Sequence, residues 1–237
     1  MHDDRTRLHA FPDREALAEA LAERTLAALT AGLEAHPGGV TWAVSGGSTP
    51  RLLFGRVAEA RFPWDRVHVA LVDERWVPFD HPRSNEAFVA RELAPLFAQG
   101  AKRVGMYDGQ PGPDEAVAEV DAAYRRLPPI GPCLLGLGPD GHTASLFPGA
   151  QGLEAALDPE GARWVAALRA DRSEVTGAEV ERMSLTVAAL RQARFPHLLI
   201  AGEDKRAALE RAAREPDLPI ARVLAALTRP LEVFWAP

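Results

Sequence analysis

Residues 40–50 read VTWAVSGGSTP, an apolar, β-branched run that ends in a turn of small and hydroxyl-bearing residues. Such a run predicts a buried strand, and the proline that closes it suits the first turn of a following helix. Apolar β-branched runs and alanine-rich helical segments alternate along the rest of the chain in the same way, which is typical of βα units. We therefore expect an α/β fold with a mostly parallel sheet and helices on both of its faces.

Further βα units are expected on both sides of this one. The pattern predicts helices over 13–34 (with Asp13 as N-cap), 50–60, 84–97, 114–126, 203–214 and 219–227. It predicts strands over 40–45, 67–73, 103–107, 133–137, 164–168, 197–201 and 231–235, and leaves 184–192 open between a strand end and a helix. Since no repeat, low-complexity tract or long linker divides the chain, we expect a single domain over residues 1–237.

Composition excludes several classes of protein. The 237 residues are 47% hydrophobic and 25% charged, as in a globular domain, and the net charge of −6 argues weakly against a nucleic-acid partner. No apolar run approaches the roughly 20 residues that span a bilayer, and the acidic N-terminus does not read as a signal peptide. The single cysteine, Cys133, makes neither an internal disulfide nor a thiolate metal cage. We expect a cytoplasmic protein that binds neither nucleic acid nor membrane.

The turn after the strand at 40–45 has the composition of an anion-binding loop. Gly46 and Gly47 let the backbone turn sharply and approach a ligand, and Ser48 and Thr49 add hydroxyl groups. Free N–H groups at the start of the next helix favour a phosphate at this point. An ordinary strand-to-helix turn with a Ser or Thr cap explains the same residue types equally well.

A second polar loop follows the strand at 67–73. It carries Asp73, Glu74 and Arg75 and runs on to Asn85, the only asparagine in the chain. Ligands bind at the carboxyl ends of parallel strands, where Asp73 and Arg75 would orient hydroxyl groups and an anion. The alternatives are a salt-bridged loop and, for Asn85, a place in a helix that Ser84 caps.

The third loop, residues 138–149, reads GPDGHTASLFPG. With Gly136 before it, this loop matches the glycine spacing of a dinucleotide-binding turn. We reject that interpretation because Pro139 removes a backbone N–H from the turn and Pro148 cuts the following helix short.

The same loop places Asp140 two residues before His142. A carboxylate holds an imidazole in one tautomer and leaves its other nitrogen free as a general base near neutral pH. The alternative is a histidine that caps a short helix or bonds to its own loop. No HxH or HExxH spacing indicates a metal. The other histidines are interpreted as surface or packing residues: His2, His9, His36, His68, His81 and His197.

Two cations complete the set of candidate residues. Of the 27 basic residues only Lys102 and Lys205 are lysines, and Lys205 falls in the first turn of an expected helix. The helix dipole favours acids there, so an anion from solvent would account for this lysine. Arg182 lies beside another expected strand. Together with the glycine-rich loop and the His–Asp pair, these cations indicate an enzyme that acts on a small phosphorylated metabolite.

These blocks together resemble the 6-phosphogluconolactonase family, and they occur in the family's order along nearly the whole chain. The matching blocks are 46–50, 73–75 with 77–78, 84–85, 138–148, and Gly202 with Lys205. The resemblance implies a Rossmann-like sandwich of the kind found in sugar-phosphate isomerases. It also implies a cofactor-free hydrolase of 6-phospho-D-glucono-1,5-lactone in the oxidative pentose phosphate pathway.

The resemblance also suggests roles for individual residues. We expect His142 to act as general base on water and Asp140 to orient it, with no metal and no cofactor, in a monomer or weak homodimer. The expected substrate- and phosphate-binding residues are Gly46, Gly47, Ser48, Thr49, Asp73, Arg75, Asn85, Arg182 and Lys205.

Three alternatives to a lactonase are considered. Glucosamine-6-phosphate deaminase/isomerase shares the fold, but that family carries a glutamate where this chain has Phe147, and an apolar ring cannot relay a proton. A sugar-phosphate-binding module without catalysis would have lost Asp140 or His142, and both are present. A nucleotide-binding oxidoreductase is weakened by Pro139.

Overall fold

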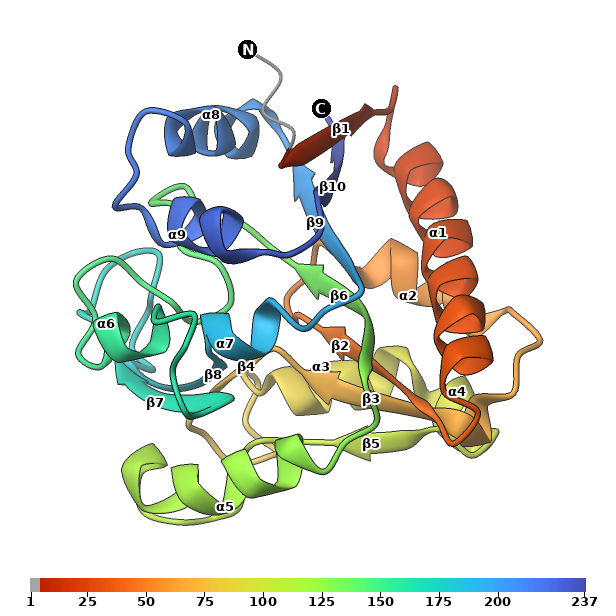
Figure 1. The fold of residues 1–237 in the computed structure, drawn as a ribbon, viewed down its shortest axis with the longest axis horizontal. Helices are drawn as coiled ribbons and strands as arrows, with labels where there is room; N and C mark the ends of the chain where they lie inside the picture. The colour runs from red at the N-terminus through yellow and green to blue at the C-terminus, as the bar shows by residue number, and fades with distance from the viewer. Residues whose placement is uncertain (1–4) are drawn as a thin grey trace.

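Seven parallel strands form the central sheet of the computed structural model, which describes residues 5–237 (Figure 1). Their order is β1-β10-β9-β6-β2-β3-β5. Because the strands run parallel, their carboxyl ends share one edge of the sheet, which is where ligands bind in such folds. The strands are β1 (Thr6–Ala10), β2 (Val40–Val44), β3 (Val67–Leu71), β5 (Lys102–Val104), β6 (Ile130–Leu135), β9 (Phe195–Ala201) and β10 (Leu231–Ala236).

Helices lie on both faces of this sheet, as the alternating pattern predicts. In Figure 1, α1 covers one face, and α7 and α9 lie on the other. The helices are α1 (Arg14–Ala35), α2 (Arg51–Ala58), α3 (Asn85–Glu92), α4 (Ala94–Ala98), α5 (Pro113–Arg125), α6 (Leu153–Ala156), α7 (Val187–Leu190), α8 (Glu203–Ala212) and α9 (Pro219–Ala226), with a 3₁₀ turn at Trp64–Arg66.

A second, antiparallel sheet of three short strands was not predicted. It has the order β4 (Asp73–Arg75), β8 (Glu181–Leu185) and β7 (Val165–Arg169). The strand expected over 67–73 is confirmed over Val67–Leu71 as β3, but its end is wrong, because the chain then leaves the central sheet and β4 pairs with β8. This pairing sets Arg75 opposite Arg182.

Helix ends follow the capping residues in the sequence. Asp13 accepts a hydrogen bond from the N–H of Ala16 at 2.8 Å, which confirms it as the N-cap of α1. The run 84–97 is two helices, because α3 ends at Glu92 and Pro95 lies in the first turn of α4. The ambiguous run 184–192 holds both a strand end and a helix, since β8 gives way to α7, whose N-cap is Thr186.

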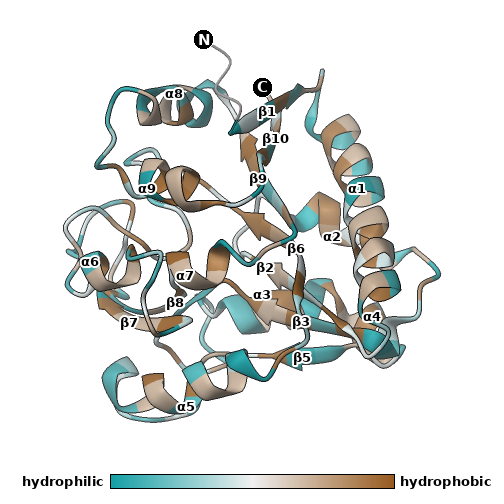
Figure 2. Cartoon of the chain, viewed as in Figure 1, coloured by the Kyte–Doolittle hydropathy of each residue, from teal (hydrophilic) through white to brown (hydrophobic). Residues whose placement is uncertain are grey.

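The core lies around the central strands, which are hydrophobic along their length (Figure 2). All residues of β2 and β6 are buried, as expected for strands covered on both faces. The edge strand β1 was not predicted, because its five residues are exposed or half-buried and carry no apolar run. Within residues 5–237, no helix combines the length and apolar character needed to cross a membrane.

Candidate active site

A cavity of about 330 Å³ opens at the carboxyl edge of the central sheet. The three loops that the sequence singles out meet around it, because they follow β2, β3 with β4, and β6. The predicted site residues that line it are Gly46, Thr49, Asp73, Arg75, Asn85, His142 and Lys205. Gly47, Ser48, Asp140 and Arg182 lie outside the lining.

The loop between β2 and α2 leaves consecutive backbone donors unused. Within the described chain, the N–H groups of Gly47, Ser48 and Thr49 donate to no protein acceptor. Gly47 has φ = +89°, a conformation that glycine adopts without strain. Free N–H groups in succession at the start of a helix form a cradle for an anion, so the geometry favours the phosphate-loop interpretation over a capped turn.

Gly46 is required because another site residue lies against it. A Cβ atom on Gly46 would lie 2.1 Å from Oδ1 of Asn85. Asn85 donates from Nδ2 to the carbonyl of Asp73 at 2.9 Å and accepts from Nη1 of Arg75 at 3.1 Å. The only asparagine of the chain therefore connects the loop after β2 with β4 at the cavity wall.

His142 and Asp140 form a pair in the turn after β6. Nδ1 of His142 lies 2.5 Å from Oδ1 of Asp140, and among residues 5–237 Nε2 of His142 has no hydrogen-bond partner. Burial raises the pKa of Asp140, but the hydrogen bond and charge of His142 outweigh it and hold that pKa below its usual value. The imidazole stacks on Phe147 with ring centroids 4.1 Å apart. Asp140 therefore fixes the ring while the opposite nitrogen stays available.

Asp73 and Ser145 connect the second and third loops. Ser145 Oγ donates to Oδ2 of Asp73 at 2.7 Å, and both side chains are buried. Ser145 was not singled out from the sequence as a binding residue; only its place in the third loop marked it.

Glu74 is a buried carboxylate that organises the cavity wall without lining the cavity. Oε1 accepts from the backbone N–H groups of Arg75 and Asn85 at 2.8 and 2.7 Å, and Oε2 accepts from the N–H of Glu86 at 2.7 Å and from Ser84 Oγ at 3.1 Å. Burial raises the pKa of Glu74 to about 7, against the three backbone hydrogen bonds, which lower it. Sequence reasoning treated Glu74 only as part of a motif.

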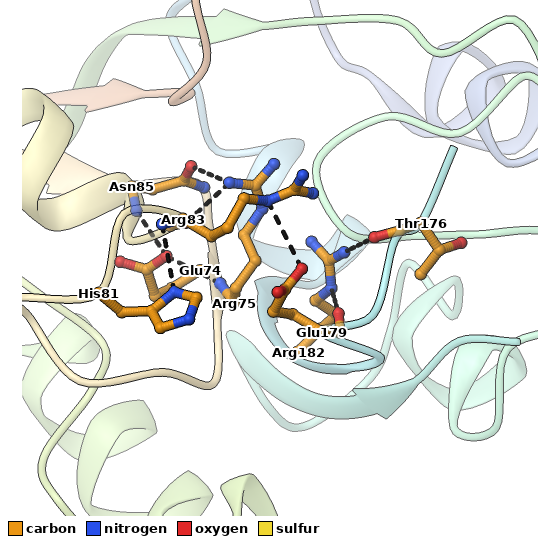
Figure 3. A network of polar contacts seen from close by, with 8 residues as sticks. All are labelled: Glu74, Arg75, His81, Arg83, Asn85, Thr176, Glu179 and Arg182. Carbon is orange, nitrogen blue, oxygen red and sulfur yellow. Dashed lines mark hydrogen bonds and ion pairs between the residues drawn. The ribbon is translucent and has the colours of Figure 1, made fainter. Parts of the chain in front are cut away.

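Arg182 is buried behind the cavity wall and does not line the cavity. It is 2% exposed, and its Nε and Nη2 atoms donate to the carbonyls of Glu179 and Thr176, each at 2.7 Å (Figure 3). Burial, followed by the charge of Arg75, lowers the pKa of Arg182 to about 10. These two bonds hold the turn that carries Val175, an exposed apolar residue that lines the cavity and that the sequence did not indicate.

Arg75 and Lys205 bring positive charge to the cavity itself. Nη1 of Arg75 donates to the carbonyl of Arg83 at 2.8 Å, and its Nε is buried without a hydrogen-bond partner. Figure 3 shows Arg75, Arg83 and Arg182 close together. Lys205 lies in the first turn of α8 and makes no ion pair within the described part of the chain. Crowded or unpaired cations of this kind suit an anionic ligand.

A model of the family described as glucosamine-6-phosphate isomerases/6-phosphogluconolactonase matches residues 12–235. The chain belongs to this family. A curated 6-phosphogluconolactonase from Mesorhizobium japonicum is 46% identical over 231 residues, which cover 97% of this chain and 94% of the relative. Another, from Rhizobium meliloti, is 38% identical over 234 residues, and the match covers 97% of this chain and 98% of the relative.

Solved structures place the chain in the same family. The crystal structure of a 6-phosphogluconolactonase from Shewanella baltica is similar with a TM-score of 0.88 and 30% identity, and the match covers 98% of each chain. A monomeric glucosamine-6-phosphate deaminase shares the fold, with a TM-score of 0.78 and 14% identity. The Rossmann-like sandwich that the motifs implied is confirmed.

Phe147, which the resemblance sets where the isomerases carry a glutamate, is buried beside the cavity and does not line it. Its ring lies against that of His142. Among the described residues, no group of three or more His, Cys, Asp or Glu side chains is arranged to hold a metal ion.

Proposed function

We propose that this chain hydrolyses 6-phospho-D-glucono-1,5-lactone to 6-phospho-D-gluconate. One arrangement carries the proposal: His142, fixed by Asp140 at Nδ1, lines the same cavity as the glycine-rich loop and Lys205. The cavity therefore combines a base with an anion cradle. The apolar Phe147 beside the base favours hydrolysis over isomerisation, because it provides no second proton-transfer group. The names of the relatives support the same substrate.

The reaction follows from the positions of these groups. Nε2 of His142 takes a proton from water as the water oxygen attacks C1 of the lactone, and Asp140 stabilises the imidazolium that forms. The bond between C1 and the ring oxygen then breaks, and the imidazolium returns the proton to that oxygen. General-base assistance of this kind contributes about 10²–10⁴-fold to the rate.

The phosphate provides the binding energy that positions C1. We assign it to the free N–H groups of Gly47, Ser48 and Thr49, together with Lys205 and Arg75. A remote dianion held in this way orients the reacting carbon against the base. Arg182 contributes indirectly, since it holds the turn that carries Val175 into the lining. The proposal retains the expectation of a cytoplasmic monomer or weak homodimer.

Proton release from freshly made lactone tests the function. We expect fast acid production from the phosphorylated lactone above the uncatalysed rate, and little from unphosphorylated gluconolactone, because the latter lacks the group that the loop binds. Equal rates with both lactones would remove the phosphate assignment. An absence of acceleration with either would contradict the function, and glucosamine-6-phosphate would then be the next substrate to measure.

A further inference from the structure

A second hollow, of about 510 Å³, lies at the opposite, amino edge of the sheet. It is enclosed by the middle of α1, the start of β9, the start of β10 and Arg7 of β1. Strand β9 contributes to both sites: His197, near its start, lines this hollow, and Ala201, at its end, lines the candidate active site. The two residues are four positions apart, which is about 13 Å of extended chain, so a ligand here is separate from the lactone.

Three unpaired cations line this hollow. Arg24, Arg194 and Arg229 are exposed and, among residues 5–237, have no ion-pair partner. The guanidinium of Arg194 lies over the ring of Phe195, 5.6 Å from its centroid, and forms no hydrogen bond to a described residue. The chain as a whole has a net charge of −6, so a concave surface with three uncompensated arginines departs from its overall charge.

A buried imidazole faces the same hollow. His197 is 4% exposed and lines the hollow, and its side chain makes no hydrogen bond within the described chain. Its ring packs edge-on against Phe234, with centroids 5.6 Å apart. Burial lowers the pKa of His197 to about 4; the charge of Glu232 opposes this shift and that of Arg24 adds to it. The ring is therefore neutral at pH 7 and offers one N–H donor. The ring nitrogens of His197 are not fully enclosed by protein, so they are open to a ligand that enters the hollow.

The one carboxylate that lines the hollow, Glu232, already has partners within the protein. Glu232 accepts from Nη1 of Arg7 at 3.2 Å, and its other oxygen lies 2.5 Å from Nε2 of His9. Burial raises the pKa of Glu232, but these two hydrogen bonds outweigh it and hold the carboxyl ionised. Arg7 therefore balances the charge of Glu232, and His9 contacts its other oxygen, which leaves the three unpaired arginines without an anion.

A larger hollow of about 860 Å³ borders this one, and Arg194 and Arg229 line both. The larger hollow adds Arg125 and Arg191, which are paired with Asp121 and Glu160. The shared pair therefore lies between the two hollows, within reach of a ligand that extends from one into the other.

We propose that these hollows bind a small ligand that carries two or more phosphate groups, with one phosphate at His197 and Arg24 and the next between Arg194 and Arg229. Guanidinium groups bind phosphate oxygens through paired N–H donors, and a neutral imidazole adds a further donor to the phosphate in the smaller hollow. The site is independent of the proposed lactonase activity, and none of these residues belongs to the catalytic cavity.

Inorganic pyrophosphate is the probe that tests this site. The first readout is the NMR signals of the His197 imidazole while pyrophosphate is added, because His197 lines only the smaller hollow. The second is calorimetric affinity, measured with saturating 6-phosphogluconate present in every sample to fill the candidate active site. We expect the His197 signals to shift with pyrophosphate, and with orthophosphate only at much higher concentration. Equal affinity for the two ions would overturn the two-phosphate site.

A pair of double variants separates a defined site from general charge attraction. Arg194→Gln/Arg229→Gln removes the shared cations, and Arg14→Gln/Arg61→Gln removes the same charge from exposed positions outside both hollows. We expect the first to weaken pyrophosphate binding by about tenfold or more and the second to leave it unchanged, with lactone turnover unaltered in both. Equal weakening in both variants, or an unshifted His197 spectrum in the native chain, would overturn the proposal.

Discussion

Nδ1 of His142 lies 2.5 Å from Oδ1 of Asp140, and the same oxygen accepts the backbone N–H of His142 at 3.2 Å. The two residues lie two positions apart in one turn, and hydrogen bonds from Arg211 of α8 and Ile220 of α9 to backbone carbonyls of that turn hold it in place. The imidazole is therefore oriented before substrate arrives, and its Nε2 is the nitrogen left for chemistry. Several predictions about the reaction rest on this geometry.

Removing the base should reduce turnover while leaving binding largely intact. We expect His142→Ala to lower kcat by about 10²–10⁴-fold with little change in KM, because the phosphate-binding groups are elsewhere in the cavity. Asp140→Asn should also lower kcat, because an amide in place of the carboxylate no longer stabilises the imidazolium. Steady-state proton release measures both, and native turnover in His142→Ala would exclude this residue as the base.

The two lysines offer a matched comparison for the phosphate site. Lys205→Ala should raise KM for the phosphorylated lactone with a smaller effect on kcat, because it removes a cation that lines the cavity. Lys102→Ala removes the same charge from the exposed strand β5 and should leave KM unchanged. If both variants raise KM equally, general attraction of the substrate, not contact with Lys205, is the cause.

Gly138 is expected to be intolerant of any side chain. A Cβ atom there would lie 2.0 Å from Nδ1 of His142 and 2.5 Å from Oδ1 of Asp140. Gly138→Ala should therefore displace the pair and lower kcat by at least tenfold, since misplaced catalytic groups lose much of their effect. Gly55→Ala adds the same methyl group in open space on α2 and is the control. Near-native kcat in Gly138→Ala would show that the pair tolerates displacement.

Glu74 should affect stability and substrate binding together. In Glu74→Gln an amide NH₂ group faces backbone N–H donors, which we expect to cost about 1–3 kcal/mol of unfolding free energy. Because Oε1 positions Arg75 and Asn85, KM should rise as well. Ser84→Ala loses the N-cap of α3 and one donor to Oε2 but leaves Oε1 untouched, so it should lower stability with KM unchanged. Denaturant unfolding and KM, measured on both variants, distinguish the two effects.

His197 should make stability depend on pH. Its pKa falls from 6.5 to about 4 on folding, so the unfolded chain binds the extra proton first as pH drops. The contribution of His197 to the free energy of unfolding is therefore fully present above pH 6.5 and is lost between pH 6.5 and 4, by roughly 3 kcal/mol. Glu74, whose pKa folding raises to about 7, acts in the opposite direction over this range, so the variant and not the native curve alone isolates the histidine. The loss over this window should be smaller in His197→Asn than in the native chain, and unchanged in His36→Asn at an exposed position. An identical slope in His197→Asn would assign the dependence to other groups.

The loops of the site could be predicted from the sequence because each follows an apolar run. The strands at β2, β3 and β6 read clearly as buried, and parallel strands bring their carboxyl ends together whatever the details of packing. The glycines marked turns, and the spacing of Asp140 and His142 marked a pair. The residue types of each loop, together with the rule that ligands bind at the carboxyl ends of parallel strands, were sufficient to predict where these loops meet.

The small antiparallel sheet and its consequences could not be predicted. β4 consists of three charged residues, and it pairs with β8, which lies more than a hundred residues away in the sequence. No hydrophobic periodicity in the sequence therefore indicates this pairing. The burial of Arg182 follows from that pairing and from the carbonyls it meets in the 176–179 turn. Glu74 likewise needs the backbone of α3 beside it before its role is visible.

The pairing of β1 with β10 has a consequence for biosynthesis. β10 lies between β1 and β9, so the strand made after all the others described here completes the sheet between two strands made earlier. While the chain is being translated, β1 has no neighbour and β9 presents an open edge. Open edges of this kind pair readily with other chains. Ribosome-bound intermediates should therefore be the most aggregation-prone form of this protein, and release of the C-terminal strand should protect the edge of β9.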